Sequence, residues 1–297
     1  MYSLCSGMGT VRMAVALKTT PKTIQRKIKH LAIICDSFQN THMNNWKVKP
    51  QFQFDEMWSC EKSRGSTLTV PTVVDKESYF IVAARAAHDF SLLSVPYFRE
   101  ENNAKRWHRI KNKNKEITAV LNKCNIMKPN GRIVMETDKK IIYQKLLKNV
   151  FRKRLVHIPY DASKPHEAIK LFPINNTMAC FRAEMAKFRR ESWYISKSTT
   201  WLNAHIAIYT VFYNYFRKKK YTETRTPYLV TDPSTGKALT QYHKTYKTKT
   251  PAMRLGIFDK PITFQFLMQN FGIEISPVSS GKPIPLIPKA IPILKAA

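Results

Sequence analysis

Apolar side chains recur at helical spacing near the start of the chain. A helix is predicted to open at Pro21, with Thr20 as its cap and proline at the tolerated first position. Its apolar stripe follows the spacing i, i+4, i+7 and i+11, at Ile24, Ile28, Leu31 and Cys35. A shorter helix is predicted at 9–17, with a break at 18–20. The pattern therefore predicts two helices joined by a tight turn and ending near residue 38.

Runs rich in Val, Ile, Thr, Tyr and Phe follow, and these residue types favour strands. Three such runs are joined by short polar connections, which predicts an antiparallel meander, at residues 51–58, 67–74 and 78–84. Two later strands are predicted, at 132–137 and 152–160. A helix is expected at 116–127 and another directly after Asp138. Residues 87–114 read as a loop with a basic, aromatic stretch.

Two longer helices are predicted in the second half, at 175–191 and 200–219. The second is very aromatic, and such a stripe is far more often core than a platform for stacking bases. Beyond residue 220 the chain turns to Thr, Lys, Tyr and Pro, and residues 283–292 alternate proline with Ile and Leu. An extended, proline-rich tail is expected there.

These elements predict the organisation of the chain. Three antiparallel strands, a helix, a strand ending in an acid and later helices match an α/β, ribonuclease-H-like fold with a mixed five-stranded sheet. Four regions follow: a helix-turn-helix at 1–38, a linker at 39–50, the ribonuclease-H-like domain at 51–220, and a basic extension at 221–297.

Charge points to the partner. The chain has 50 Lys+Arg against 20 Asp+Glu, a formal net charge of +30. With 43% hydrophobic residues it is predicted to fold, so a basic surface suited to nucleic acid is expected. The plainer alternative is a ribosomal-type or non-specifically adhesive basic protein. The five cysteines lie far apart without zinc-site spacing, and no stretch suits a membrane helix; free thiols in the cytoplasm and no membrane are expected.

The second predicted helix carries a polar face that would suit the major groove. A helix-turn-helix reader inserts its second helix there. The alternative is an ordinary helical hairpin with a solvated basic face. The residues proposed to contact DNA are Lys22, Gln25, Arg26 and Lys29.

Several phrases, in their order, resemble insertion-sequence transposases of the DDE type. They are Phe54-Asp55-Glu56-Met57, Thr137-Asp138, the stretches 171–182 and 188–193, Ser196-Lys197, Thr250-Pro251-Ala252 and Leu255-Gly256-Ile257. The resemblance covers most of the chain, up to about Gly256. It implies an enzyme that cuts and joins double-stranded DNA, at element ends and target, with Mg²⁺ or Mn²⁺. It also implies homo-oligomers on DNA and a prokaryotic, nucleoid-associated protein.

The resemblance assigns two metal ligands, Asp55 and Asp138. They would lie side by side if the first and fourth strands are adjacent, and magnesium needs only one or two carboxylates besides phosphate and water. The third ligand departs from the usual pattern because Asn175-Asn176 stand where an acid is expected. Glu167 is the first choice and Asn175 the next, while Glu184 is expected to form a surface ion pair.

A basic cluster around the helix at 175–191 would position phosphates, or else form a solvated face. Its members are Arg182, Lys187, Arg189, Arg190 and Lys197. A zinc-binding segment common before the helix pair in relatives is not seen, so a truncated copy is expected. Two other functions remain open: a catalytically impaired, transposase-derived DNA-binding protein, and a nuclease of the same fold.

Overall fold

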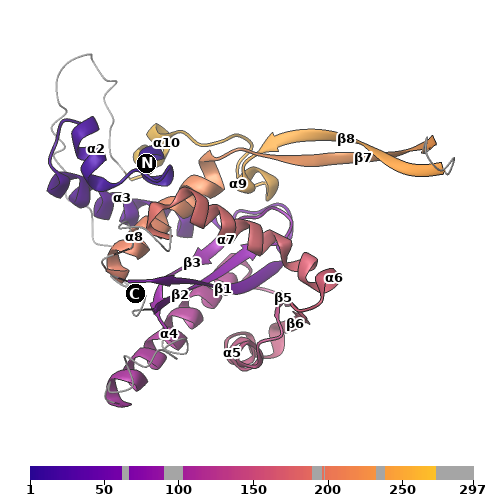
Figure 1. The fold of residues 1–297 in the computed structure, drawn as a ribbon, viewed down its shortest axis with the longest axis horizontal. Coiled ribbons are helices and arrows are strands. Elements are labelled where there is room, and N and C mark those ends of the chain that lie inside the picture. Colours follow the sequence, from indigo (N-terminus) through magenta and orange to yellow (C-terminus); the bar gives the residue numbers. More distant parts are fainter. Residues whose placement is uncertain (62–66, 90–102, 189–195, 197, 232–237, 272–297) are drawn as a thin grey trace.

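A mixed sheet forms the centre of the molecule (Figure 1). The computed structural model describes residues 1–61, 67–89, 103–188, 196, 198–231 and 238–271. The strands in the sheet are β1 (Phe52–Cys60), β2 (Thr67–Asp75), β3 (Ile81–Ala84), β4 (Ala87–His88), β5 (Ile133–Asp138) and β6 (Leu155–Tyr160). Their order is β3-β2-β1-β5-β6, and the short β4 pairs with β2.

The strand directions agree with the predicted fold class. β1 runs antiparallel to β2, and β2 antiparallel to β3, whereas β5 runs parallel to β1 and to β6. All nine residues of β2 are buried, because helices cover both faces of the sheet at this strand. The α/β class with a mixed sheet and flanking helices is confirmed, and the strand order is consistent with a ribonuclease-H-like fold. The sheet has six strands among the described residues instead of the predicted five, because the short β4 adds to β2.

Helices lie on both faces of the sheet, with α7 and α8 on one side and α4 and α5 on the other (Figure 1). The helices are α1 (Tyr2–Cys5), α2 (Thr10–Ala16), α3 (Pro21–His42), α4 (Asn103–Met127), α5 (Ile141–Phe151), α6 (Pro165–Ala168), α7 (Phe172–Glu184), α8 (Thr199–Val211), α9 (Pro251–Arg254) and α10 (Phe264–Gln269). Single turns are η2 (Arg152–Arg154), η3 (Ile169–Leu171), η4 (Ala186–Phe188) and the π-helical η5 (Phe212–Phe216).

The predicted helix pair at the start is present. The backbone N–H of Thr23 donates to Oγ1 of Thr20 at 3.2 Å, so threonine caps α3 as expected. The helix continues to His42, into the range predicted as linker. Its apolar side packs into the main core, where the ring of Phe38 meets Tyr215 edge-on with centroids 5.2 Å apart. The helix pair thus shares one hydrophobic core with the sheet. That α3 binds DNA stays a prediction.

One expectation about the middle of the chain is wrong. Residues 103–114, predicted as loop, belong to the 25-residue helix α4. This segment has no Gly or Pro and is rich in Lys, Arg and Asn around a few apolar residues. Lys and Arg have high helix propensity, and the apolar second half of α4 anchors the whole helix on the sheet.

The aromatic stripe of the second half is core, as predicted. Tyr209, Tyr213 and Tyr215 are all at most 1% exposed, on α8 and η5. The five cysteines are free, and four of them are buried. Among the described residues, no helix combines the length and the apolar character that a membrane crossing needs.

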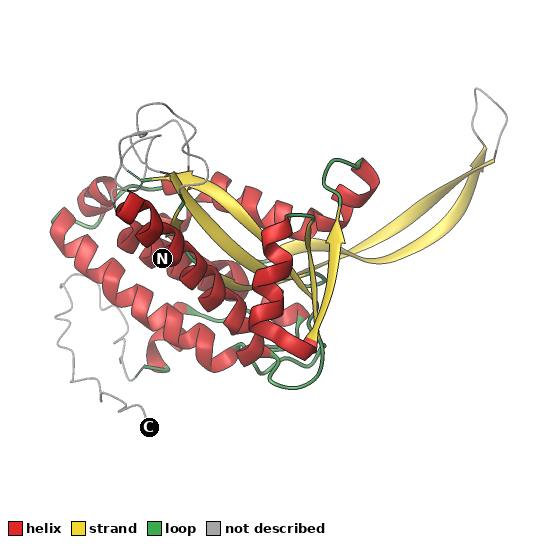
Figure 2. Cartoon of the chain, turned by 90° about the horizontal axis from the view of Figure 1, so that it is seen from below, coloured by secondary structure: helices red, strands yellow, loops and turns green. Residues whose placement is uncertain are grey.

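A long two-stranded ribbon leaves the body after η5. It consists of β7 (Lys219–Thr231) and β8 (Ala238–Lys249), paired antiparallel. Both views show it projecting away from the sheet and its helices (Figures 1 and 2). The first part of the range predicted as a basic extension therefore contains regular structure, while the proline-rich tail predicted at 283–292 lies outside the described residues.

The chain returns to the core after the ribbon. The carbonyl of Leu255 accepts hydrogen bonds from the backbone N–H groups of Lys47 and Val48, at 2.8 and 3.1 Å. Gly256 follows with φ +72°, and a Cβ there would lie 2.9 Å from Cβ of Lys47, so only glycine fits. The ring of Phe258 then stacks on Phe38 at 6.1 Å. Residues after the ribbon thus close the core beside the entry to β1.

Candidate active site

Two carboxylates lie level with each other on adjacent parallel strands. β1 and β5 pair with Phe52 opposite Met135 and Gln53 opposite Glu136. Continuing that register places Asp55 level with Asp138, which is the last residue of β5. In a parallel pair, residues in register point to the same face. Both acids therefore share the face of the sheet that α7 covers.

A lysine joins the two carboxylates. Nζ of Lys140 lies 3.4 Å from Oδ1 of Asp55 and 3.2 Å from Oδ2 of Asp138. The Asp138 carboxylate also accepts from the backbone N–H of Lys140 at 3.4 Å. Lys140 is the N-cap residue of α5, which therefore begins two residues later than the predicted helix start, and Asp138 is not its cap.

The pKa values of Asp55 and Lys140 reflect partial burial opposed by neighbouring charges. Burial raises the pKa of Asp55; the Lys140 ammonium and the N–H of Glu56 oppose this rise, whereas the Asp138 charge adds to it. Burial lowers the pKa of Lys140, but the two carboxylates outweigh burial and raise it on balance. The charged acids and the cation between them thus stabilise each other.

The residues two positions before the acids form a buried network. Nε2 of Gln53 donates to Oε2 of Glu136 and to the carbonyl of Lys170, both at 2.8 Å. Oε1 of Gln53 accepts from the N–H of Ile174 at 3.1 Å. Nζ of Lys76 completes the network with a 2.7 Å ion pair to Glu136. These bonds tie β1 to β5 and to the start of α7, and so fix the strand register that aligns Asp55 with Asp138.

Glu56, the acid next to Asp55 in β1, points the other way. Oε2 of Glu56 accepts from Oγ1 of Thr69 at 2.7 Å and forms a 3.1 Å ion pair with Lys113 of α4. Lys113 also pairs with Asp89 at 3.0 Å. Glu56 is thus neutralised on the opposite face of the sheet, because successive strand residues alternate between faces.

Glu167 lies in another group of contacts. It belongs to α6, and its Oε2 accepts from the backbone N–H of Asp161 at 2.6 Å, which lowers its pKa. Lys164 and His166 lie 3.7 and 3.8 Å from its other oxygen. The bonds of Glu167 therefore organise the loop that follows β6, and none of its described bonds joins it to Asp55 or Asp138.

The other two candidates for a third ligand lie on α7. Asn175 is exposed. Glu184, at the far end of the helix, accepts from the hydroxyl of Tyr209 at 3.0 Å and pairs with Arg217 at 2.5 Å. Its predicted role as an ion-pair residue agrees with this position, although the partner is Arg217. Asp55 and Asp138 are thus the two candidate ligands that the structure brings together.

The basic residues predicted to contact DNA are divided between two places. Lys22, Gln25, Arg26 and Lys29 are exposed on α3, and Nζ of Lys29 lies 4.9 Å above the ring of Trp201. Arg182 is exposed at the end of α7, and Lys187 is half-buried in η4. Arg189, Arg190 and Lys197 lie outside the described residues.

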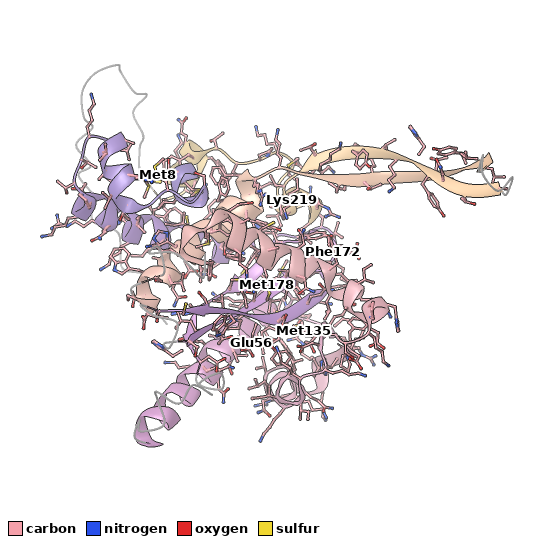
Figure 3. All side chains as sticks on the ribbon, viewed as in Figure 1. Met8, Glu56, Met135, Phe172, Met178 and Lys219 are labelled. Atoms are coloured by element: carbon pink, nitrogen blue, oxygen red, sulfur yellow. The ribbon has the colours of Figure 1, made fainter. Side chains whose placement is uncertain are left out.

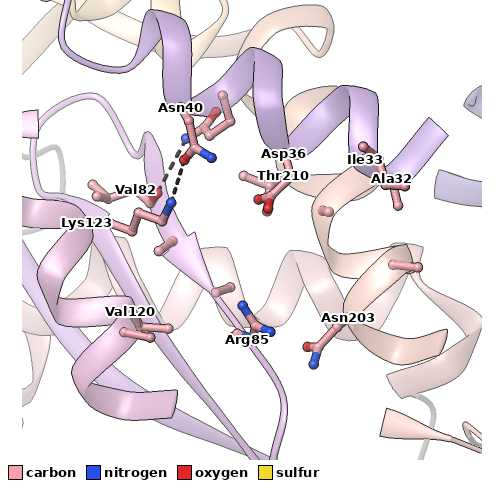
Figure 4. A pocket seen from close by; sticks show the side chains of 16 residues that line it. Ala32, Ile33, Asp36, Asn40, Val82, Arg85, Val120, Lys123, Asn203 and Thr210 are labelled. Carbon is pink, nitrogen blue, oxygen red and sulfur yellow. Dashed lines mark hydrogen bonds between the residues drawn. The ribbon is translucent and has the colours of Figure 1, made fainter. Parts of the chain in front are cut away.

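A separate hollow of about 260 Å³ lies where α3, α4 and α8 meet β3 (Figure 4). Asp36, Arg85 and Asn203 line it, and Nζ of Lys123 donates to Oδ1 of Asn40 at 2.6 Å on one side. Its volume is below the roughly 300 Å³ at which small-molecule sites begin. Its lining includes neither Asp55 nor Asp138, so it is independent of the candidate active site.

The sequence pattern missed Lys140, Gln53 and Glu136 as parts of the site. The spacing could have revealed two of them, since Gln53-Phe54-Asp55 and Glu136-Thr137-Asp138 place a polar residue two positions before each acid. On adjacent parallel strands this spacing stacks the polar pair below the acidic pair on one face. Lys140 offers no comparable pattern among the many lysines of this chain.

The donor set suits a small divalent cation. Two carboxylate oxygens already face one ammonium group, so the site accepts positive charge. Mg²⁺ takes one or two carboxylates and completes its shell with water and phosphate. Within the described ranges, no three His, Cys, Asp or Glu side chains gather as a metal site. The residues therefore fit a metal held by two acids and a substrate, not a cage made by protein alone.

Comparison with known proteins gives little help. No family model matches the chain, and no curated protein matches it. A solved structure that it resembles is the catalytic domain of Mos1 mariner transposase, at 10% identity and a TM-score of 0.26, over 62% of this chain and 89% of that chain. This likeness is too weak to assign a function, so the functional argument rests on the geometry of the chain itself.

Proposed function

We propose that this protein is a metal-dependent DNA transposase of the DDE type, which cuts and joins phosphodiester bonds. The observation that carries the proposal is the pairing of Asp55 with Asp138 around the Lys140 ammonium, on two adjacent parallel strands. The excess of 30 positive charges supports a polyanionic substrate. The order of the helices and strands, together with the sequence phrases that resemble DDE transposases, supports DNA transposition as the reaction.

Asp55 and Asp138 would hold Mg²⁺ or Mn²⁺, which when bound supplies charge stabilisation at the phosphate and lowers the pKa of water. The chain supplies rigidity. The carboxylate of Asp55 is fixed by the N–H of Glu56 at 2.7 Å and by the hydroxyl of Tyr143 at 3.3 Å. Lys140 is half-exposed, so its flexible side chain can turn from the acids to a phosphate oxygen once another cation balances them.

Glu167 is proposed as the third ligand, with Asn175 as the second choice and Glu184 as the last. Glu167 would have to exchange its bond with the Asp161 N–H for the metal. Asn175 is exposed and free of such a requirement, but its neutral amide is a weaker ligand. Glu184 would have to leave its ion pair with Arg217.

The exposed polar face of α3 is proposed to bind element ends. Arg182 and Lys187, with Arg189, Arg190 and Lys197, would position phosphates near the acids. Pairing of two DNA ends requires at least two copies of the protein, so we expect homo-oligomers on DNA. Each of these roles is separable from catalysis by mutation.

The test measures nicking of supercoiled plasmid, and joining of a labelled oligonucleotide 3′-end to that plasmid, with Mg²⁺ or Mn²⁺. The wild type is compared with Asp55→Asn, Asp138→Asn and the matched control Asp259→Asn, an exposed acid 3.6 Å from Lys47. We expect the first two variants to lose both products and the control to retain them. Metal-dependent nicking that survives in Asp55→Asn and Asp138→Asn would refute the proposal.

Two other functions have support in particular observations. A catalytically impaired DNA-binding protein is favoured by the bonds that tie Glu167 and Glu184 elsewhere. Salt-sensitive binding without any cut in the wild type would identify it. A nuclease of the same fold would share the acid pair, and nicking without joining would identify that activity.

A further inference from the structure

The β7–β8 ribbon is a structural arm with both faces in solvent. Twelve residue pairs, from Lys219 opposite Lys249 to Thr231 opposite Ala238, extend it to about 40 Å at a strand rise of about 3.4 Å. Every residue from 241 to 248 is exposed. An isolated two-stranded hairpin is only marginally stable in water, and this one has no core of its own. A binding function of its surface would explain why the protein has such a ribbon.

The ribbon carries strong positive charge. Its two strands contain six Lys or Arg and a single acid, Glu223, which pairs with Lys247. On β8 a lysine and two tyrosines alternate on one face, because strand residues two positions apart point the same way. They are Tyr242, Lys244 and Tyr246, and Nζ of Lys220 from β7 lies 4.2 Å above the ring of Tyr246. Ammonium groups and phenol hydroxyls are suitable donors to phosphate oxygens.

The root of the ribbon lies beside the face that holds the acid pair. Lys219 and Arg254 both lie over the ring of Tyr79, at 5.5 and 5.6 Å, and Figure 3 shows Lys219 at the start of the ribbon. Tyr79 and Arg254 line one shallow hollow together with Lys76 and Lys170, which belong to the Gln53 network or border it. Cations therefore continue from the neighbourhood of Asp55 and Asp138 to the ribbon.

The unpaired edges of the ribbon are poorly suited to another protein strand. Pro227 removes one N–H group from β7, and a bulge between Thr222 and Thr224 interrupts the regular ladder. Lysines recur along β8. Each of these features opposes edge-to-edge pairing between chains. A duplex of nucleic acid needs no free backbone edge, and a two-stranded ribbon fits the major groove.

We propose that the β7–β8 ribbon is a second nucleic-acid-binding arm, which lies along the duplex beyond the point held at Asp55 and Asp138. It rests on the proposed function for the identity of the substrate, but it concerns a different surface and makes its own prediction. The exposed lysines and tyrosines contact the phosphate backbone, so the arm adds affinity without reading sequence. Lys220 and Lys244 are its central contacts.

The test measures binding of the full chain to a fluorescein-labelled duplex of about 30 base pairs, which exceeds the length of the ribbon. Fluorescence anisotropy is recorded in EDTA over a range of salt concentrations, so no chemistry takes part. For Lys220→Ala with Lys244→Ala, the slope of log K against log salt should fall by up to about 1.8, and affinity at 0.1 M salt roughly tenfold or more.

The matched control is Lys145→Ala with Lys148→Ala, two exposed lysines of α5. It removes the same charge from the opposite side of the sheet. We expect the control to keep the slope of the wild type. Equal losses in both double variants, or no loss in the ribbon variant, would overturn the proposal, since either result removes any special role of the arm. Circular dichroism verifies that both variants are folded.

A second measurement uses the unaltered chain. Lysine acetylation followed by mass spectrometry, with and without the duplex in EDTA, should show protection of Lys220 and Lys244 and unchanged reactivity of Lys145 and Lys148. Light scattering tests the alternative occupant, a second copy of the chain. A ribbon variant that changes oligomeric state while the salt slope stays constant would overturn the proposal. Metal-dependent nicking that persists in that case would leave the proposed function intact.

Discussion

The hydroxyl of Tyr143 donates to Oδ1 of Asp55 at 3.3 Å, although Tyr143 belongs to the helix on the opposite side of the sheet from α7. The tyrosine ring is fully buried and packs edge-on against Phe54, with centroids 4.9 Å apart. The helix thus anchors the same strand twice, once through an apolar ring and once through the carboxylate. A hydroxyl that donates to a carboxylate favours its charged form, so we expect this contact to influence the ionisation of Asp55.

We predict that Tyr143→Phe shifts the acid limb of metal-dependent cleavage to higher pH. Loss of the donor disfavours the charged carboxylate, so the pKa of Asp55, which burial already raises, should rise further. The measurement is the cleavage rate as a function of pH. Tyr209→Phe is the control, because its hydroxyl bonds to Glu184 instead. A profile that does not move in Tyr143→Phe would show that the contact has no effect on ionisation.

Asp55→Asn should raise the thermal midpoint at pH 7. Because burial raises the folded-state pKa of Asp55, the folded protein binds this proton more tightly than the unfolded chain does. Stability from this group is therefore present at low pH and is lost as pH rises through the folded pKa. The difference between variant and wild type should shrink as pH falls through that value. Differential scanning calorimetry at several pH values measures it, and a lower midpoint for Asp55→Asn at pH 7 would contradict it.

Lys76→Met should destabilise the fold by about 3 kcal/mol, since it leaves a buried carboxylate without its cation. The Glu136 side chain is only 4% exposed, and its ion pair with Lys76 measures 2.7 Å. The control is Lys47→Met, whose partner Asp259 is 91% exposed; a change below about 1 kcal/mol is expected there. Urea unfolding gives both values. Equal losses of unfolding free energy in the two variants would show that the Gln53–Glu136–Lys76 network does not contribute specially to stability.

Asn214→Ala should cost about 2 to 3 kcal/mol, because the buried N–H of Ile81 and Oε1 of Gln39 lose their hydrogen-bond partner, while the carbonyl of Ile81 keeps a bond from Nε2 of Gln39. Oδ1 of Asn214 accepts from the N–H of Ile81 at 2.8 Å, and its amide donates to the carbonyl of Ile81 at 2.8 Å and to Gln39 at 3.3 Å. Asn122→Ala, at an exposed site on α4, should change stability by less than about 0.5 kcal/mol. Chemical denaturation followed by fluorescence compares them, and a loss below 1 kcal/mol in Asn214→Ala would be inconsistent with these bonds.

The sheet was predictable because its strands carry local patterns. The runs around Phe54 and Val73 combine strand-forming residues with polar breaks, and the acid at the end of β5 follows a short apolar run, Ile133-Val134-Met135. Parallel pairing of β1 with β5 also follows from the fold class, and that pairing brings Asp55 to Asp138. This part of the candidate site could therefore be located from the sequence.

Other parts carry no local pattern. The ribbon has no apolar face, so its Thr, Lys and Tyr residues resemble a linker until β7 and β8 pair with each other. Helix α4 begins in a segment with few apolar residues, so no helical spacing of apolar positions is visible there in the sequence. The partners of Glu167 and Glu184 depend on Asp161 and Arg217, which are brought to them by tertiary packing. Contacts of this kind are decided by the fold as a whole.

The closing of the core by residues after the ribbon affects how the chain folds during synthesis. Phe38 and the N–H of Lys47 obtain their partners Phe258 and Leu255 only when more than two hundred further residues have been made. Contacts so distant in sequence slow folding, and apolar surface stays exposed meanwhile. A nascent chain that has already produced both acids of the candidate site is therefore still incomplete, and the ribbon must leave the ribosome before the fold can close.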